Sequence, residues 1–149
     1  MKLVVLALLL GACAGSAKPG PATTTAPQHG KPLYDRLGGM DRIDAIVKDF
    51  VEVQIAQDDR IRDRFKDTDR AHFQTMLADQ ICEASGGPCK YSGKTMHEAH
   101  AGLGIGEAEF RVFLDDLRKS LHALQVPEHE QDEVLAALAI SKSEIVDAQ

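Results

Sequence analysis

The chain has 149 residues, which at roughly 100–200 residues per domain allows one folded domain and a tail. It carries 17 Lys and Arg against 23 Asp and Glu, a formal net charge of -6, and so lacks the excess of basic residues that binding to a nucleic-acid backbone requires. Hydrophobic residues make up 44% of the sequence and charged residues 27%, close to globular averages. We therefore expect a single domain that folds in water and binds no nucleic acid.

The N-terminus has the pattern of a secretory signal. A basic residue precedes an unbroken apolar run over residues 3–10, which is too short for a permanent transmembrane helix. The following Leu10-Gly11-Ala12-Cys13 resembles the lipobox of bacterial lipoproteins, where cleavage leaves a lipidated cysteine as the new N-terminus. We therefore expect residues 1–12 to be a lipoprotein signal peptide and Cys13 to carry a lipid anchor. The alternative is an ordinary signal peptide cleaved near Ala17.

Residues 13–32 cannot bury a core, because they hold four of the six prolines and almost no large apolar side chain. We expect them to form a flexible Pro-, Ala- and Thr-rich tether to a domain at residues 33–149. A lipid anchor predicts a place in the bacterial cell envelope facing the periplasm, and Ala14 favours the outer membrane by analogy with other lipoproteins. Because the chain is acidic, acidic phospholipid headgroups would repel it. Attachment to the membrane would therefore depend on the lipid chains and not on a basic patch.

The other two cysteines, Cys82 and Cys89, lie seven residues apart across a Gly-Gly-Pro turn. This spacing permits a disulfide, and an oxidising compartment outside the inner membrane favours one. The alternative is a pair of free cysteines that act as small apolar side chains.

Apolar residues recur at the helical spacing i, i+3, i+4, i+7 in three segments. They are Ile43, Ile46, Val47, Phe50 and Val51 in a segment from Met40, then Phe73, Met76, Leu77 and Ala84, then Phe110, Phe113, Leu114, Leu117, Leu121 and Leu124. A fourth helix is expected from Pro127, where acidic residues in the first turn complement the helix dipole. No stretch alternates with a period of two, so the predicted fold class is all-α.

Histidines give a weak signal for a metal site. His97 and His100 lie three residues apart in a short segment that begins at Met96, and this spacing permits binding of a transition metal together with His72 or a thiolate. The sequence has no HExxH motif, no phosphate-binding glycine-rich motif and no Ser-His-Asp pattern. These residues do not indicate a hydrolase.

Several short motifs follow one another along the predicted domain. They are Leu33-Tyr34-Asp35-Arg36-Leu37-Gly38-Gly39, Asp49-Phe50, Asp58-Asp59-Arg60-Ile61 ahead of Phe65, Gly86-Gly87-Pro88 with Tyr91-Ser92-Gly93, and Met96-His97-Glu98-Ala99-His100 followed by Gly102-Leu103-Gly104-Ile105. In this order and spacing they resemble the motifs of the group I truncated haemoglobins, and the resemblance runs from Leu33 to about Val146. The resemblance implies a truncated two-over-two globin sandwich around one haem b, which would bind oxygen (O2), nitric oxide (NO) or carbon monoxide (CO).

The resemblance also implies roles for single residues around the haem, some of them on the proximal side, which carries the protein ligand. His100 matches the proximal histidine, whose imidazole binds the haem iron. Phe50 matches a phenylalanine that packs against the porphyrin, and Met96 and Ile105 match positions near the proximal side. His97, three residues before His100, is expected to face away.

On the opposite, distal side the sequence departs from the family. Val51 stands where relatives commonly have a tyrosine that donates a hydrogen bond to bound oxygen. The remaining distal positions, which often hold Gln, His or Lys in relatives, are Phe73, Met76, Leu77 and Ile81. Because such a hydrogen bond is worth roughly 1–3 kcal/mol, we expect oxygen to bind about tenfold to a hundredfold more weakly than in relatives with the tyrosine.

Two alternative functions stay open. Met76 lies where some relatives supply a sixth iron ligand, and a His100/Met76 pair would resemble cytochrome ligation and favour electron transfer. Met76 would otherwise be a flexible side chain that fills the pocket. The second alternative is a haem-free helical module that presents His97 and His100 to copper or zinc. Turnover would need a reductase partner, which this sequence does not reveal, so we do not assign an enzyme.

Overall fold

The computed structural model describes residues 30–146. These residues form α1 (Leu33–Leu37), α2 (Met40–Asp49), the π-helix η1 (Phe50–Ile55), the 3-10 helix η2 (Arg62–Phe65), α3 (Arg70–Ala84), α4 (Met96–His100), α5 (Glu107–Ala123), α6 (Glu128–Ala139) and α7 (Lys142–Ile145). No strand occurs in this range, so the all-α prediction is confirmed. The expected signal peptide, Cys13 and most of the tether lie outside the described residues.

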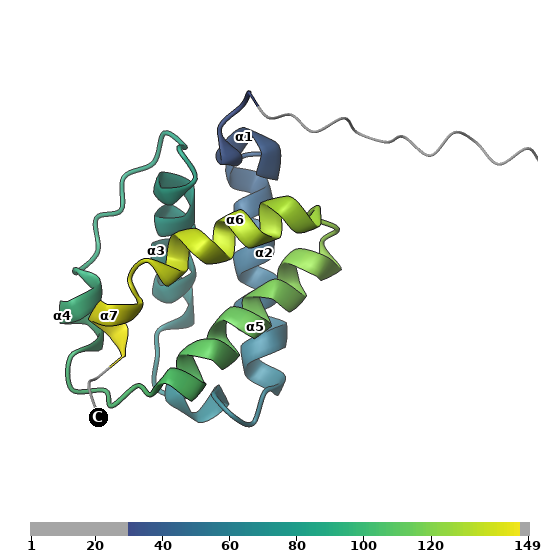
Figure 1. Cartoon of the computed structure of the whole chain (residues 1–149). Helices are drawn as coiled ribbons and strands as arrows, with labels where there is room; N and C mark the ends of the chain where they lie inside the picture. Colours follow the sequence, from purple (N-terminus) through teal and green to yellow (C-terminus); the bar gives the residue numbers. More distant parts are fainter. Residues whose placement is uncertain (1–29, 147–149) are drawn as a thin grey trace, which may run out of the picture.

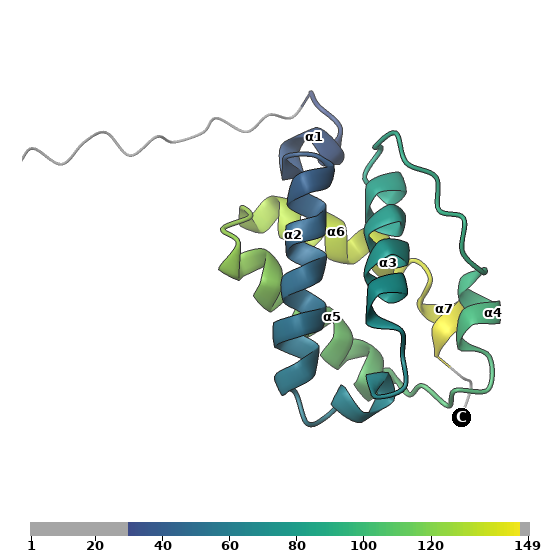
Figure 2. The same cartoon turned by 180° about the vertical axis from the view of Figure 1, so that it is seen from behind.

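Four helices form two layers (Figure 1). One layer contains α2 and α3, which pack side by side, and the other contains α5 and α6, which cross over them. Figure 2 shows the same layers from behind, with α2 and α3 toward the viewer. This is the expected two-over-two sandwich. None of the helices in residues 30–146 has both the length and the apolar composition of a membrane-spanning segment.

The predicted helix starts agree with the structure. Helix α1 ends at Gly38, whose φ of 101° lies in the left-handed region that favours glycine, and α2 begins two residues later at Met40. Helix α6 begins directly after Pro127, as the sequence predicts. The predicted first helix differs in one respect, because Phe50 and Val51 lie in the π-helix η1 that continues α2.

The core lies between the two layers and is built from apolar side chains of α2, η1, α3, α5 and α6. Its largest fully buried side chain is Phe50, whose ring meets that of Phe113 on α5 edge to face with centroids 4.9 Å apart. Helices α4 and α7 pack against each other but contribute no buried residue. The segment around His100 therefore lies beside the core and is not part of it.

A disulfide joins Cys82 at the end of α3 to Cys89 in the loop that leads to α4, with Cα atoms 5.8 Å apart. Cys82 is fully buried. A Cβ on Gly87 would lie only 2.6 Å from the Cys82 sulfur and 2.5 Å from Tyr34 Cδ2, so a larger residue does not fit there. The Gly-Gly-Pro turn thus allows this loop to fold closely over the cross-link.

Candidate functional site

The short helix α4 carries His100, and its first turn is held by a capping box. Thr95 Oγ1 accepts a hydrogen bond from the Glu98 amide at 3.2 Å, and Glu98 Oε2 accepts one from the Thr95 amide at 3.1 Å. The Thr95 hydroxyl also donates to Glu98 at 2.8 Å, and these bonds lower the pKa of the Glu98 carboxyl. A helix of only five residues is thereby fixed at its N-terminus.

The ring of His100 is oriented by its own helix. Its Nδ1 lies 2.7 Å from the carbonyl oxygen of Met96. Because a carbonyl can only accept, Nδ1 carries the hydrogen of this bond, and in the neutral imidazole Nε2 then has a free lone pair. This is the arrangement in which a histidine serves as a metal ligand, with the second ring nitrogen bonded to a backbone carbonyl. His100 is half-buried, whereas His97 is exposed as expected.

Helix α3 supplies most of the residues predicted for the distal side. Leu77 and Ile81 are buried in the core, while Phe73 and Met76 stay partly exposed. Farther along the same helix, the Gln80 side-chain amide lies 3.5 Å from the Met96 sulfur, so α3 and α4 are in contact. Partly exposed apolar side chains thus occur on both helices, and Ile105, between α4 and α5, is half-buried as well.

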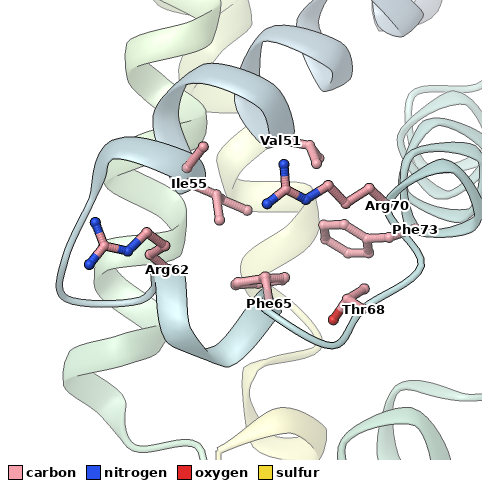
Figure 3. A pocket seen from close by; sticks show the side chains of 8 residues that line it. Val51, Ile55, Arg62, Phe65, Thr68, Arg70 and Phe73 are labelled. Atoms are coloured by element: carbon pink, nitrogen blue, oxygen red, sulfur yellow. The ribbon is translucent and has the colours of Figure 1, made fainter.

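A small cavity lies between η1, η2 and the start of α3 (Figure 3). It brings together the predicted distal residues Val51 and Phe73 with Phe65, whose ring centroid lies 5.3 Å from that of Phe73. The cavity is small, with a volume of about 10 Å³, which is enough for one water-sized molecule. The full lining is Val51, Ile55, Ala56, Arg62, Phe65, Thr68, Arg70 and Phe73.

Phe65 lines the cavity but is not among the site residues predicted from the sequence, where it appears only as the residue that follows the Asp58-Asp59-Arg60-Ile61 motif. The signal was available, because a lone aromatic after the Asp58-Asp59-Arg60-Ile61 turn needs an apolar surface to cover it. Phe50, in contrast, is entirely enclosed by protein. Its predicted contact with a porphyrin stays a prediction.

The described histidines do not gather into a metal site of their own. His72 and His97 are both exposed. Within residues 30–146, no group of three or more His, Cys, Asp or Glu side chains is placed to hold a metal ion. A metal bound by His100 would therefore need further ligands from outside this set of side chains.

Two helical layers and a half-buried histidine whose Nδ1 is bonded to a backbone carbonyl are compatible with a globin. Comparison with known proteins places the chain more closely. A model of the bacterial-like globin family matches residues 32–146, and the chain belongs to this family. The expected fold family is thus confirmed, and a haem-binding globin is the function that membership supports.

Several relatives are truncated haemoglobins. The chain is 37% identical over 108 residues to the group 1 truncated hemoglobin of Synechocystis sp., which covers 70% of this chain and 86% of the relative. It is 34% identical over 94 residues to the group 1 truncated hemoglobin of Tetrahymena pyriformis, which covers 63% and 77% of the two chains.

Solved structures agree with this assignment. Truncated hemoglobin from Tetrahymena pyriformis in the Fe(III) form superposes with a TM-score of 0.75 at 27% identity, over 79% of this chain and 100% of that one. The 2/2 hemoglobin of Synechococcus sp., solved in the cyanomet state with covalently attached heme, gives a TM-score of 0.73 at 25% identity, with the same coverage.

Proposed function

We propose that this protein binds one haem b through His100 and that the haem iron reversibly binds oxygen or another diatomic gas. The observation that carries the proposal is the 2.7 Å hydrogen bond from His100 Nδ1 to the Met96 carbonyl, which leaves Nε2 free to bind a metal. The haem, when bound, supplies an iron atom with a coordination position for the gas. The protein's part is to hold this iron and to shape the surroundings of the gas.

The predicted contact residues fit an apolar ring. On the proximal side Met96 and Ile105 are half-buried, as a side chain is when an apolar partner covers the rest of its surface. The distal residues are buried or half-buried and none is charged. They are Val51, Phe73, Met76, Leu77 and Ile81.

The position where relatives commonly have a tyrosine offers bound oxygen no hydrogen-bond donor, because Val51 stands there. The neighbouring cavity is lined by five apolar side chains and by three with donors, Arg62, Thr68 and Arg70. An oxygen molecule bound to iron carries partial negative charge, so a missing donor weakens its binding, whereas carbon monoxide depends less on such a bond. We therefore propose a protein whose selectivity is shifted away from tight oxygen storage.

The proposal is tested by replacing the ligand. His100→Gly should abolish stable haem incorporation, and imidazole added to the purified variant should restore the absorption spectrum, because the free ring can occupy the vacated position. His97→Gly, three residues away and exposed, is the matched control and should keep its haem. A His100→Gly variant that retains haem with an unchanged spectrum would refute the assignment.

Spectra of the unmodified protein separate gas binding from electron transfer. A five-coordinate ferrous form that takes up carbon monoxide readily is the expected result. Six-coordinate low-spin spectra in both redox states, with a methionine-to-iron charge-transfer band, would point to Met76 as a second axial ligand and to electron transfer. A protein without a Soret band in any redox state would contain no haem, and both gas binding and electron transfer would be refuted.

We also propose that the domain is anchored in the cell envelope through lipid on Cys13. This rests on the sequence, because residues 1–29 lie outside the described range. The wild-type protein should partition into a detergent phase when expressed with its first twelve residues, and Cys13→Ser should stay in the aqueous phase. Equal partitioning of both forms would exclude the anchor.

A further inference from the structure

One arginine connects segments that are far apart in the sequence. Arg64 lies in η2, next to Phe65 of the distal cavity. Its Nη1 donates to the Leu103 carbonyl at 2.8 Å and its Nη2 to the Gly104 carbonyl at 3.3 Å. Its Nε and Nη2 also donate to the two carboxylate oxygens of Glu109, at 2.6 and 3.0 Å. The guanidinium is thus bonded to three residues that lie about forty positions later in the chain.

These partners lie directly after the candidate ligand. The Leu103 amide donates to the His100 carbonyl at 3.1 Å, so one residue links the guanidinium to the end of α4. Glu109 accepts a further hydrogen bond from the Gly106 amide at 3.1 Å, which holds the last residue of the loop before α5. Arg64 and Glu109 together therefore hold the middle of the loop over residues 101–106 and its last residue.

Apolar packing of this loop is limited. Ile105 is half-buried, Leu103 is 52% exposed, and a Cβ on either Gly102 or Gly104 would meet nothing within 4 Å. Helices α4 and η2 contribute no buried residue. Because core packing is weak here, we expect the position of His100 to depend on polar contacts that reach α5, which has buried residues in the core.

The geometry of the contact makes it stronger than an ordinary surface ion pair. Arg64 and Glu109 have side chains 46% and 27% exposed, and a single exposed pair of this kind contributes little. Here the guanidinium binds the carboxylate with two nitrogens and also donates to two backbone carbonyls, which adds direction as well as attraction. A lysine cannot make this set of bonds, since it has one nitrogen.

We propose that Arg64 is a positioning residue for His100: it holds the loop over residues 101–106 against η2 and so fixes the proximal imidazole relative to the distal wall at Phe65. The inference rests on the proposed role of His100 as the iron ligand. It adds that the two sides of the site are joined through one side chain on the surface.

The test compares three variants of the full chain loaded with haem. Arg64→Ala removes the hydrogen bonds to Leu103, Gly104 and Glu109. Arg64→Lys keeps the positive charge but has only one nitrogen to donate from. Arg118→Ala is the matched control, because Arg118 is 47% exposed and pairs only with Asp132, between α5 and α6, among the contacts of the described residues. Two quantities are measured: the iron–histidine stretching band of the ferrous protein, and the rate of haem loss to an excess of an acceptor protein.

Arg64→Ala should lose haem about tenfold faster than wild type and should shift or broaden the iron–histidine band, because two carbonyls and a carboxylate lose their donor. Arg64→Lys should resemble Arg64→Ala, and Arg118→Ala should match wild type in both measurements. An Arg64→Ala protein that matches Arg118→Ala in band and rate would overturn the proposal. A change in thermal stability alone would also count against it, since that is what a merely structural contact produces.

A second readout separates this inference from the proposed function. Amide hydrogen exchange in the haem-free protein should be faster in Arg64→Ala than in wild type at Leu103 and Gly106, whose amides donate to the His100 carbonyl and to Glu109, whatever the iron ligand is. Unchanged exchange would refute the proposal that Arg64 holds the loop over residues 101–106. If exchange rises but His100→Gly shows that His100 is not the ligand, the proposed function fails and the positioning role falls with it.

Discussion

Opening the disulfide between Cys82 and Cys89 should lower the free energy of unfolding by about 2.4 kcal/mol. The two cysteines are seven residues apart, and the number follows from the conformational entropy that a cross-link closing so short a loop removes from the unfolded chain. Native packing should change little, because Cys82 is fully buried and its reduced thiol would occupy nearly the same apolar surroundings. The entropy of the unfolded chain therefore accounts for most of the loss.

The assay is equilibrium unfolding in urea, with and without a reductant that does not bind haem, on haem-free protein. Reduction should move the midpoint to lower urea, and the double variant Cys82→Ala/Cys89→Ala should unfold near the reduced midpoint and ignore the reductant. A loss below about 1 kcal/mol would refute the reasoning, because the loop-entropy relation would then fail at this site. A loss above about 5 kcal/mol would refute it in the other direction and would mean that the loop unfolds with the cross-link.

Two further predictions concern buried or nearly buried carboxyl groups whose pKa values shift in opposite directions. Burial raises the pKa of Asp116, whose Oδ1 accepts from Lys119 at 2.6 Å while Oδ2 has no hydrogen-bond partner within residues 30–146. Its ionised form therefore destabilises the fold once pH rises above the ordinary value of 3.8. Asp116→Asn should raise the melting temperature at pH 7, and the gain should shrink toward pH 4; a loss at pH 7 would contradict this. Hydrogen bonds from Arg60 hold the pKa of Asp58 well below 3.8, so its stabilisation is present above that pH and is lost below it. Asp58→Asn should lower the melting temperature at pH 7 with a deficit that narrows in acid, and a deficit independent of pH would show that charge is not its cause.

The four long helices could be predicted because each buries one face. The apolar spacing in α2, α3, α5 and α6 is a direct consequence of packing between two layers, and Pro127 marks a boundary. The π-helix η1 could not be predicted in this way. Nothing in the sequence interrupts the pattern between Asp49 and Phe50, and the contact of η1 with α5 joins segments that are far apart in the chain.

The short helices have a different origin. Helix α4 is too short to be stable by itself and depends on its capping box, a local signal that Thr95 and Glu98 carry three residues apart. The role of Arg64 has no local signal at all, because its partners Leu103 and Glu109 lie 39 and 45 residues away. Only the fold brings them together.

Sequence patterns alone could not select His100 among the histidines. Its spacing to His97 suggests a shared metal, but the structure orients the two differently: His97 is exposed, and His100 is half-buried and bonded to Met96. The resemblance to the family is what singles out His100, and its hydrogen bond to the Met96 carbonyl appears only in the folded structure. The spacing of three residues was therefore misleading as a sign of joint ligation.

The proximal segment, which we define as α4 with the helix α7 packed against it, differs from the rest of the domain in the contacts that stabilise it. Helices α4 and α7 contact each other without a buried residue, and Ile140 between α6 and α7 is 81% exposed. Segments with few buried apolar contacts open at the lowest free energy, so this pair is the part of the haem-free protein that opens first. A ligand that contacts α3 and His100 together would bind only the closed form and would stabilise it by mass action. Under the proposed function, haem binding and closure of the proximal segment are therefore coupled, so that each favours the other. Arg64 would favour the closed form through its hydrogen bonds from η2, on the opposite side of the site.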